Sequence, residues 1–403
     1  MIQCHVAASS PEILSEQTQT RSGRRRAASG GHVDGLTGLR GLAAITVVFV
    51  HGSGLTAYPW FGLHAYGPIA LFVLSGFLLI QPWSKWIIGA APKPSLDSFI
   101  RRRLWRIFPA YLVVLVVAAL LLPLSRPVGA DGWFRALTLT NTAAADGLRP
   151  GMEHTWSLGT ELSWYAIVPV VGVLVATLGR RFWPDKPARP ILAALGIAIM
   201  VSLGWRYFVM FHITDLGQLI TFPLWLPAFL FCFLGGAAVA HLMLVARHGQ
   251  GTMRSLEWLA SKPSLVAGIA IASALIGNST LGGAWTFTAG TFQEILIRTV
   301  ACTIIATVLL IGVAAGDERS WLNRLFAMPW LVATGRWSYG LYLWHMPLML
   351  LLAREVRIQP GFAGLLIWIA ILLAVSIPLA AATYRFVEKP AIAWSKGVPV
   401  HSR

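Results

Sequence analysis

Ionisable side chains inside long apolar stretches are the first candidates for chemistry in this sequence. Four stand out: His51, Glu161, His345 and Glu388. An ionisable group inside a bilayer costs several kcal/mol unless it is paired or hydrated, so such positions point to function. Histidine is the side chain best suited to take a proton from a hydroxyl near neutral pH. The two histidines therefore indicate proton transfer.

Arg40 precedes His51 by eleven positions in a stretch whose hydropathy predicts a helix. Eleven residues make almost three full turns, so both side chains share one face, about 16 Å apart along the axis. One helix face thus presents a cation near one end and an imidazole near the other. Taken alone, His51 would more simply be a structural histidine that a backbone carbonyl satisfies.

Glu161 lies about one turn inside a predicted helix that opens with Trp156-Ser157-Leu158. This is too deep for a solvated surface carboxylate. Three roles are open to it: it could orient an imidazole, position a substrate hydroxyl, or pair with an arginine for structural reasons.

Arg103 and Arg106 stand three positions apart at the start of another predicted helix and face the same side. Forked guanidinium donors at this spacing suit the phosphates of an anionic donor such as acyl-CoA. Ordinary anchoring by basic residues at a membrane surface would explain either arginine alone.

His345 lies well inside a predicted span, directly before Met346 and Pro347. It could contact substrate or be structural. Glu388, at the end of the last span, most simply pairs with Arg385 or another arginine at that surface. Cysteine and histidine spacings give no metal signature, so we expect no metal site and no bound cofactor.

The elements that must position these residues are predicted to be membrane helices. The chain has 56% hydrophobic and 12% charged residues, against roughly 45–50% and about 25% in soluble domains. A span needs about 20 mainly apolar residues. On that basis we expect an all-α, polytopic protein with about ten helices, near residues 39–57, 64–82, 104–124, 156–178, 190–211, 223–245, 263–280, 292–314, 327–352 and 362–386.

The net charge of +16 resides in short loops between these stretches. Basic loops alternate with loops poor in lysine and arginine, which predicts both termini in the cytoplasm and argues against nucleic-acid binding. We expect a basic disordered tail over 1–36, the transmembrane domain over 37–392 and a short cytoplasmic tail over 393–403. The seventh span is the weakest. The loop of about 125–155 is a candidate lid or acceptor-contact segment.

Five motifs in order resemble the family 3 membrane acyltransferases, which include bacterial O-antigen, nodulation-factor and macrolide acylases. They are Arg40 with His51, the stretch Leu71-Phe72-Val73-Leu74-Ser75-Gly76-Phe77, Arg103 with Arg106, Trp156-Ser157-Leu158 with Glu161, and Tyr342-Leu343-Trp344-His345. The resemblance covers nearly the whole chain. One departure is Thr37, where many relatives carry an aspartate.

This resemblance implies a donor, acyl-CoA, that approaches from the cytoplasm, and transfer of a short acyl group to a hydroxyl, often on a sugar. It implies functional roles for Arg40, His51, Arg103, Arg106 and Glu161, with Ser75, Trp156 and His345 as candidate substrate contacts. A bacterial inner membrane is the expected location.

The mechanism expected from both arguments makes His51, supported by Glu161, the general base on the acceptor hydroxyl. Arg103 and Arg106 would hold the donor phosphates, and Arg40 would offset negative charge. The cytoplasmic arginines and the outer-half histidine are then separated by much of the bilayer. Two other classes stay open: a proton-coupled secondary transporter, because intramembrane His and Glu also carry protons, and a non-catalytic membrane scaffold.

Overall fold

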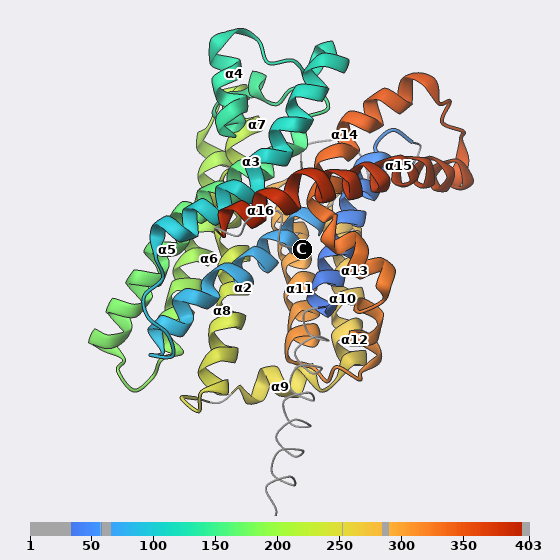
Figure 1. Ribbon diagram of the computed structural model, residues 1–403. Coiled ribbons are helices and arrows are strands. Elements are labelled where there is room, and N and C mark those ends of the chain that lie inside the picture. The colour runs from blue at the N-terminus through green and yellow to red at the C-terminus, as the bar shows by residue number, and fades with distance from the viewer. Residues whose placement is uncertain (1–33, 57, 59–65, 252, 284–289, 397–403) are drawn as a thin grey trace, which may run out of the picture.

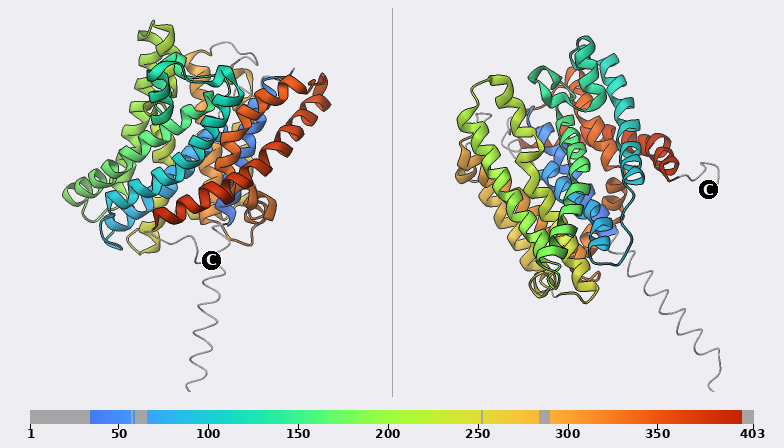
Figure 2. Two further views of the ribbon diagram at one scale, coloured as in Figure 1. Left: turned by 45° about the horizontal axis from the view of Figure 1, so that its top comes forward. Right: turned by 90° about the vertical axis from the view of Figure 1, so that its left-hand side faces the viewer.

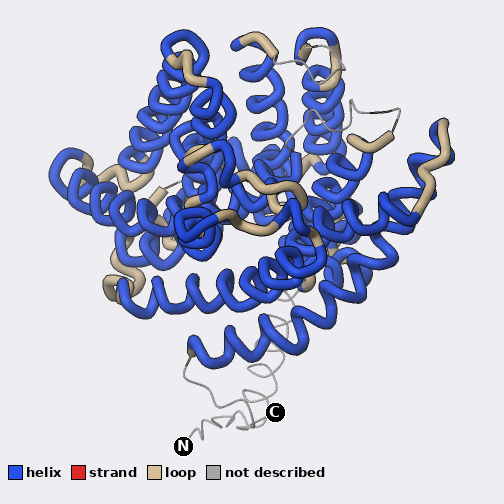
Figure 3. Tube along the Cα trace, turned by 90° about the horizontal axis from the view of Figure 1, so that it is seen from above, coloured by secondary structure: helices blue, strands red, loops and turns tan. Residues whose placement is uncertain are grey.

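The computed structural model describes residues 34–56, 58, 66–251, 253–283 and 290–396. Within these ranges every regular element is a helix and none is a strand (Figure 3). The all-α prediction is therefore confirmed. Of the tails predicted over 1–36 and 393–403, residues 1–33 and 397–403 lie outside the described residues, while 34–36 and 393–395 are helical.

The long helices lie side by side in one bundle (Figures 1 and 2). After a first helix, Asp34–Ser53, they are α2 (Tyr66–Ile87), α3 (Leu96–Leu121), α5 (Trp156–Phe182), α6 (Arg189–His212), α8 (Leu226–Arg247), α10 (Pro263–Gly277), α11 (Phe292–Ala315), α14 (Ser338–Glu355) and α15 (Gly361–Thr383). Shorter helices connect them in the chain: α4 (Gly129–Thr138), α7 (Leu216–Thr221), α9 (Arg254–Ala260), α12 (Trp321–Phe326) and α13 (Pro329–Arg336). A further short helix, α16 (Lys389–Ser395), follows α15. In Figure 1, α4 and α7 lie at one end of the bundle and α9 at the other.

Eight helices in the described part of the chain are long and apolar enough to cross a membrane, so the protein is a multi-pass membrane protein. They are Asp34–Ser53, Tyr66–Ile87, Leu96–Leu121, Glu153–Phe182, Arg189–His212, Leu216–Arg247, Phe292–Ala315 and Gly361–Ser395. The pair α9 and α10, bent by 88°, would make a ninth. This pair contains the weak seventh span.

The span expected over 327–352 is the main difference from the sequence analysis. It divides into α13 and α14, with Trp337 between them. Helix α14 has 18 residues, includes His345 and ends on Arg354 and Glu355. It is therefore not among the helices that are apolar enough to count as membrane spans. Most of its residues from Ser338 to Met349 are nonetheless buried among the other helices.

The centre of the bundle is the contact between α2 and α8, where two glycines let the backbones touch. A Cβ atom at Gly76 would lie 1.9 Å from the carbonyl oxygen of Phe233, and one at Gly236 would lie 1.9 Å from that of Val73. Small residues at such crossings allow the close packing that holds membrane helices together. Gly76 follows Ser75, so this contact also fixes where Ser75 points.

The last helices form one long rod on the outside of the bundle, red in Figures 1 and 2. Between α15 and α16 the chain makes a π-helical turn, Tyr384–Glu388. Such a turn contains an extra residue relative to the α-helix and often occurs at functional sites. Here it ends on the buried carboxyl group of Glu388.

Candidate functional site

The predicted donor-binding residues line one pocket in the protein interior, with a volume of about 340 Å³. The first helix, α2, α3, α5 and α14 form its walls. Its lining residues are Arg40, Leu71, Phe72, Leu74, Ser75, Leu78, Leu79, Arg103, Arg106, Ser157, Leu158, Glu161, Tyr165, Ser338, Tyr339 and Tyr342. The motifs that lie far apart in the sequence therefore meet here, and we call this space the arginine pocket.

Helix α3 directs Arg103 and Arg106 into this pocket. Ser95 caps its start by accepting a hydrogen bond from the backbone of Ser98, which fixes the helix phase. The guanidinium of Arg103 lies over the rings of Phe99 and Tyr165, at 5.7 and 5.9 Å. Its buried Nε has no hydrogen-bond partner among the described residues. Arg103 thus has donor capacity that the protein itself does not use.

Glu161 is held by two hydroxyl groups. Ser75 Oγ and Tyr165 Oη each donate to Glu161 Oε1 at 2.9 Å. No salt bridge within 4 Å joins Glu161 to an arginine in the described part of the chain. Among the described residues its direct partners are thus two hydroxyl groups, and neither an arginine within 4 Å nor an imidazole is among them.

Glu388 is buried, with 4% of its surface exposed. The charges that act on it are those of Arg106 and Arg40. Arg385 instead points outward over the ring of Phe386, so of the two alternatives predicted for Glu388, Arg385 or another arginine at that surface, the structure favours the second. Since the π turn displaces the register of the last helix, Glu388 faces the arginine side and Arg385 does not.

His51 and His345 contact each other at the far end of the first helix. The distance from His345 Nε2 to His51 Nδ1 is 3.1 Å, and the ring centroids are 5.0 Å apart. His51 Nδ1 also lies 3.0 Å from the carbonyl oxygen of Val47. His345 is fully buried. Its Nδ1 lies 2.6 Å from the carbonyl oxygen of Tyr342.

A third histidine, His154, completes this cluster and was missed as a site residue. Its ring lies 4.9 Å from that of His345 and 5.1 Å from that of Tyr342. Only 1% of His154 is exposed, and neither ring nitrogen has a hydrogen-bond partner among the described residues. The carbonyl of Leu343 interacts with the ring without reaching hydrogen-bond geometry. The sequence did offer a signal for this role, because His154 stands just before the motif that opens with Trp156.

Tyr342 joins the arginine pocket to the histidine cluster. Its side chain lines the pocket, and its ring contacts both His154 and His345. Its hydroxyl donates to the carbonyl of His154 and lies 2.7 Å from Ser157 Oγ. One tyrosine side chain therefore stands between the two groups of residues that the sequence placed at opposite depths.

Two predicted positions lie away from the pocket. Trp156 stacks on Phe229 at 5.4 Å and meets Phe72 edge-on at 6.0 Å, so it packs α5 against α8 and α2. Thr37 packs against α13, where a Cβ atom at Gly335 would lie 1.9 Å from its carbonyl oxygen. The aspartate position of the relatives is thus outside the pocket lining in this chain.

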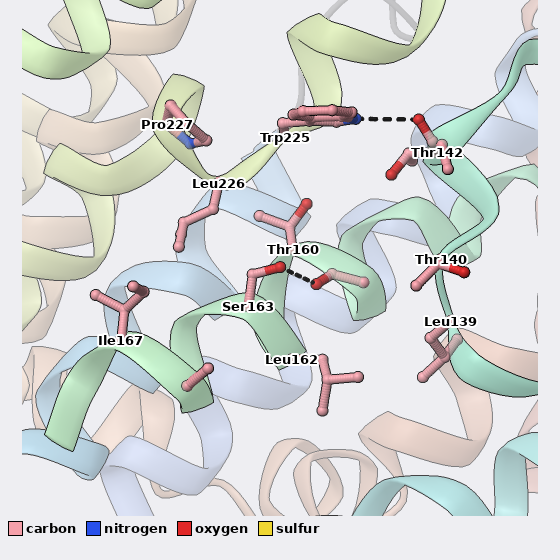
Figure 4. A pocket seen from close by; sticks show the side chains of 13 residues that line it. Leu139, Thr140, Thr142, Thr160, Leu162, Ser163, Ile167, Trp225, Leu226 and Pro227 are labelled. Atoms are coloured by element: carbon pink, nitrogen blue, oxygen red, sulfur yellow. Dashed lines mark hydrogen bonds between the residues drawn. The ribbon is translucent and has the colours of Figure 1, made fainter. Parts of the chain in front are cut away.

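A second pocket, of about 510 Å³, lies on the other side of α5 (Figure 4). Leu139, Thr140, Thr142 and Ala143 form one wall, and they belong to the 125–155 loop. Residues of α5 and the start of α8 complete it. The indole of Trp225 donates to the carbonyl of Thr142 at 3.0 Å and ties the loop to α8. Within the described ranges, no group of three or more His, Cys, Asp or Glu residues could hold a metal ion.

Fold and pocket define a multi-pass membrane protein whose interior contains a pocket with three arginines and a histidine cluster, joined by Tyr342. The acyltransferase domain family matches residues 33–385, which is most of the chain. The chain therefore belongs to this family, as the five motifs predicted.

Several curated proteins are similar in sequence. O-acetyltransferase OatA of Staphylococcus aureus (strain NCTC 8325) is 26% identical over 383 residues, covering 89% of this chain and 57% of that protein. Peptidoglycan O-acetyltransferase OatA of Listeria monocytogenes is 25% identical over 381 residues, covering 89% and 56%. The chain thus spans little more than half the length of these relatives. No solved structure matches it significantly.

Proposed function

We propose that this protein transfers a short, acetyl-like acyl group from acyl-CoA to a hydroxyl of a carbohydrate, glycolipid or similar cell-envelope acceptor. The observation that carries the proposal is the position of Tyr342, which lines a pocket with three arginines and also contacts the ring of His345, the partner of His51. Membership of the acyltransferase family supports acyl transfer. The similar proteins of Staphylococcus aureus and Listeria monocytogenes are O-acetyltransferases by name, which supports O-acetylation.

The arginine pocket suits the phosphates of acyl-CoA. Arg40, Arg103 and Arg106 line it with Glu161, and Glu388 acts on it from nearby, so positive charge is in excess. Guanidinium groups bind phosphate through forked donors. The eleven residues from Arg40 to His51 correspond to about 16 Å of helix, a length that an extended pantetheine arm can span. A donor held at the arginines would therefore bring its thioester to the level of His51.

His51 then acts as general base. Its Nδ1 is occupied by Val47 and His345, while no described residue bonds its Nε2. Nε2 takes the proton of the acceptor hydroxyl as the oxygen attacks the thioester carbonyl. The carbon–sulfur bond breaks, and the CoA thiolate leaves and receives the proton from His51. Arg40 offsets negative charge on the donor. Glu161 contributes by holding Ser75 and Tyr165 at the pocket wall.

The acceptor would approach from the opposite end of the bundle. The pocket of Figure 4 supports this arrangement, since one of its walls comes from the 125–155 loop. Basic loops support a bacterial inner membrane with both termini in the cytoplasm. The Listeria relative is named for peptidoglycan, so peptidoglycan fragments are the first acceptors to test.

The test is release of free CoA from acetyl-CoA by the purified protein in detergent, with a panel of peptidoglycan fragments, sugars and glycolipids. We expect turnover with wild type and its loss in His51→Ala. His212→Ala is the matched control, because His212 is an exposed histidine at the end of α6. Size-exclusion chromatography checks that each variant is folded.

Equal turnover in wild type and His51→Ala would remove His51 from the chemistry. If no acyl-CoA and acceptor pair gives turnover, while proteoliposomes of wild type move a radiolabelled solute, the transporter class replaces the proposal. A folded protein that does neither would be a scaffold.

A further inference from the structure

We infer that His345 is a positioning residue that, together with the backbone carbonyl of Val47, holds His51 in the one tautomer able to act as a base at Nε2. The inference rests on the proposed role of His51 and assigns His345 a different part from substrate contact. It follows from which atoms can donate. A carbonyl oxygen can only accept, so the Nδ1 of His345, 2.6 Å from the Tyr342 carbonyl, carries a hydrogen.

The remaining nitrogen of a neutral His345 is then an acceptor. His345 Nε2 lies 3.1 Å from His51 Nδ1, and the Val47 carbonyl lies 3.0 Å from the same atom. Two acceptors converge on His51 Nδ1, so this nitrogen carries the hydrogen and shares it between them. The free lone pair of His51 is thereby placed on Nε2. The chain of donors runs from His51 through His345 to the backbone of α14.

The environment explains why a histidine occupies the position that a carboxylate fills in many catalytic sites. His345 is fully buried, with 0% of its surface exposed to solvent, and the rings of His154 and Tyr342 pack against it. A carboxylate here would bury a negative charge with no guanidinium described beside it, which is costly. A neutral imidazole accepts the hydrogen without adding charge. When His51 becomes cationic during the reaction, the same hydrogen bond becomes charge-assisted and therefore stronger.

Burial also separates positioning from substrate contact. Because no surface of His345 is exposed and both its nitrogens are occupied, it has no free group to offer an acceptor. His51 is only partly buried. The reacting hydroxyl is therefore expected to meet His51 and not His345.

The test compares His345→Leu, which removes the acceptor, with His345→Gln, whose amide oxygen restores one. In His345→Leu we expect kcat for acetyl transfer to fall roughly 10- to 100-fold, as for loss of a hydrogen bond to a charged group, with the KM values for acetyl-CoA and acceptor unchanged. His345→Gln should recover part of kcat. His241→Gln is the control, because His241 is an equally buried histidine that bonds Ser84 and Pro187 outside the cluster.

A second measurement does not depend on turnover. Nitrogen-15 spectra of histidine-labelled protein, assigned by difference with His51→Ala, should show His51 protonated at Nδ1 in wild type. In His345→Leu the Val47 carbonyl is the one described acceptor left on this atom, so the share of the Nδ1-protonated tautomer should fall. An unchanged His51 signal in folded His345→Leu would overturn the inference even if acyl transfer is established. A rise in acceptor KM at constant kcat would also overturn it, because His345 would then be a substrate contact. The expected spectra without turnover would leave the positioning contact intact and count against the proposed function alone.

Discussion

Replacement of Arg103 tests most directly how the donor is held. Arg103 lines the arginine pocket, and its buried Nε lacks a partner among the described residues. A hydrogen bond from a guanidinium to phosphate contributes about 1.5–3 kcal/mol, which corresponds to roughly 10- to 150-fold in affinity. We therefore expect Arg103→Ala to raise the KM for acetyl-CoA by about that factor. Because the phosphates are bound equally in ground and transition states, kcat should change little.

The assay is CoA release over a range of acetyl-CoA concentrations, at low and high salt. Arg102→Ala is a stringent control, since Arg102 is the neighbouring residue on α3 but is exposed and outside the pocket lining. Arg103→Lys keeps the charge without the fork and should fall between the two. Equal KM values for the Arg102 and Arg103 variants would refute the phosphate role. A lower kcat at constant KM would place Arg103 at the reacting centre.

Two further substitutions test the interior. In His154→Phe, a ring of similar shape replaces an imidazole with two unpartnered nitrogens, and each buried unpartnered polar group lowers the stability of the fold by about 1–3 kcal/mol. We therefore expect CoA release to decline while the midpoint of thermal unfolding does not fall. A marked drop in that midpoint would contradict the unpartnered state of the two nitrogens. In Gly76→Ala, the new methyl group would meet the Phe233 carbonyl at 1.9 Å, so α2 and α8 must separate, at a cost of about 1–3 kcal/mol, and the contact of Ser75 with Glu161 is lost. Gly204→Ala is the control for thermal unfolding, because nothing lies within 4 Å of its added methyl group; equal stability of the two variants would refute the close contact.

The sequence predicted the fold class and most of the arginine pocket. Hydropathy predicts each span from its own stretch of sequence. The motifs grouped Arg40, Arg103, Arg106, Ser75 and Glu161 as functional residues, and all five line the arginine pocket. Helical spacing could relate Arg40 to His51 because both lie on one helix. These are local properties that a single stretch of chain carries.

Contacts between distant stretches could not be predicted in this way. His51 and His345 are 294 positions apart, and no periodicity links two helices so far separated. The same holds for Tyr342, whose hydroxyl bonds the start of α5. Glu161 was expected to support His51, but its partners Ser75 and Tyr165 follow from how α2 packs on α5. The helix count differed because hydropathy cannot tell one long span from the pair α13 and α14.

The π-helical turn at Tyr384–Glu388 makes this part of the chain sensitive to length as well as to residue type. Each residue of a helix advances the side chains by about 100°, so one residue fewer in this turn would let the backbone relax to a regular α-helix. Glu388 and all of α16 would then rotate away from Arg40 and Arg106. A one-residue deletion between Tyr384 and Val387 should therefore be more damaging than replacement of any residue it removes. Natural variants of this protein should preserve the number of residues in this turn more strictly than the residue types.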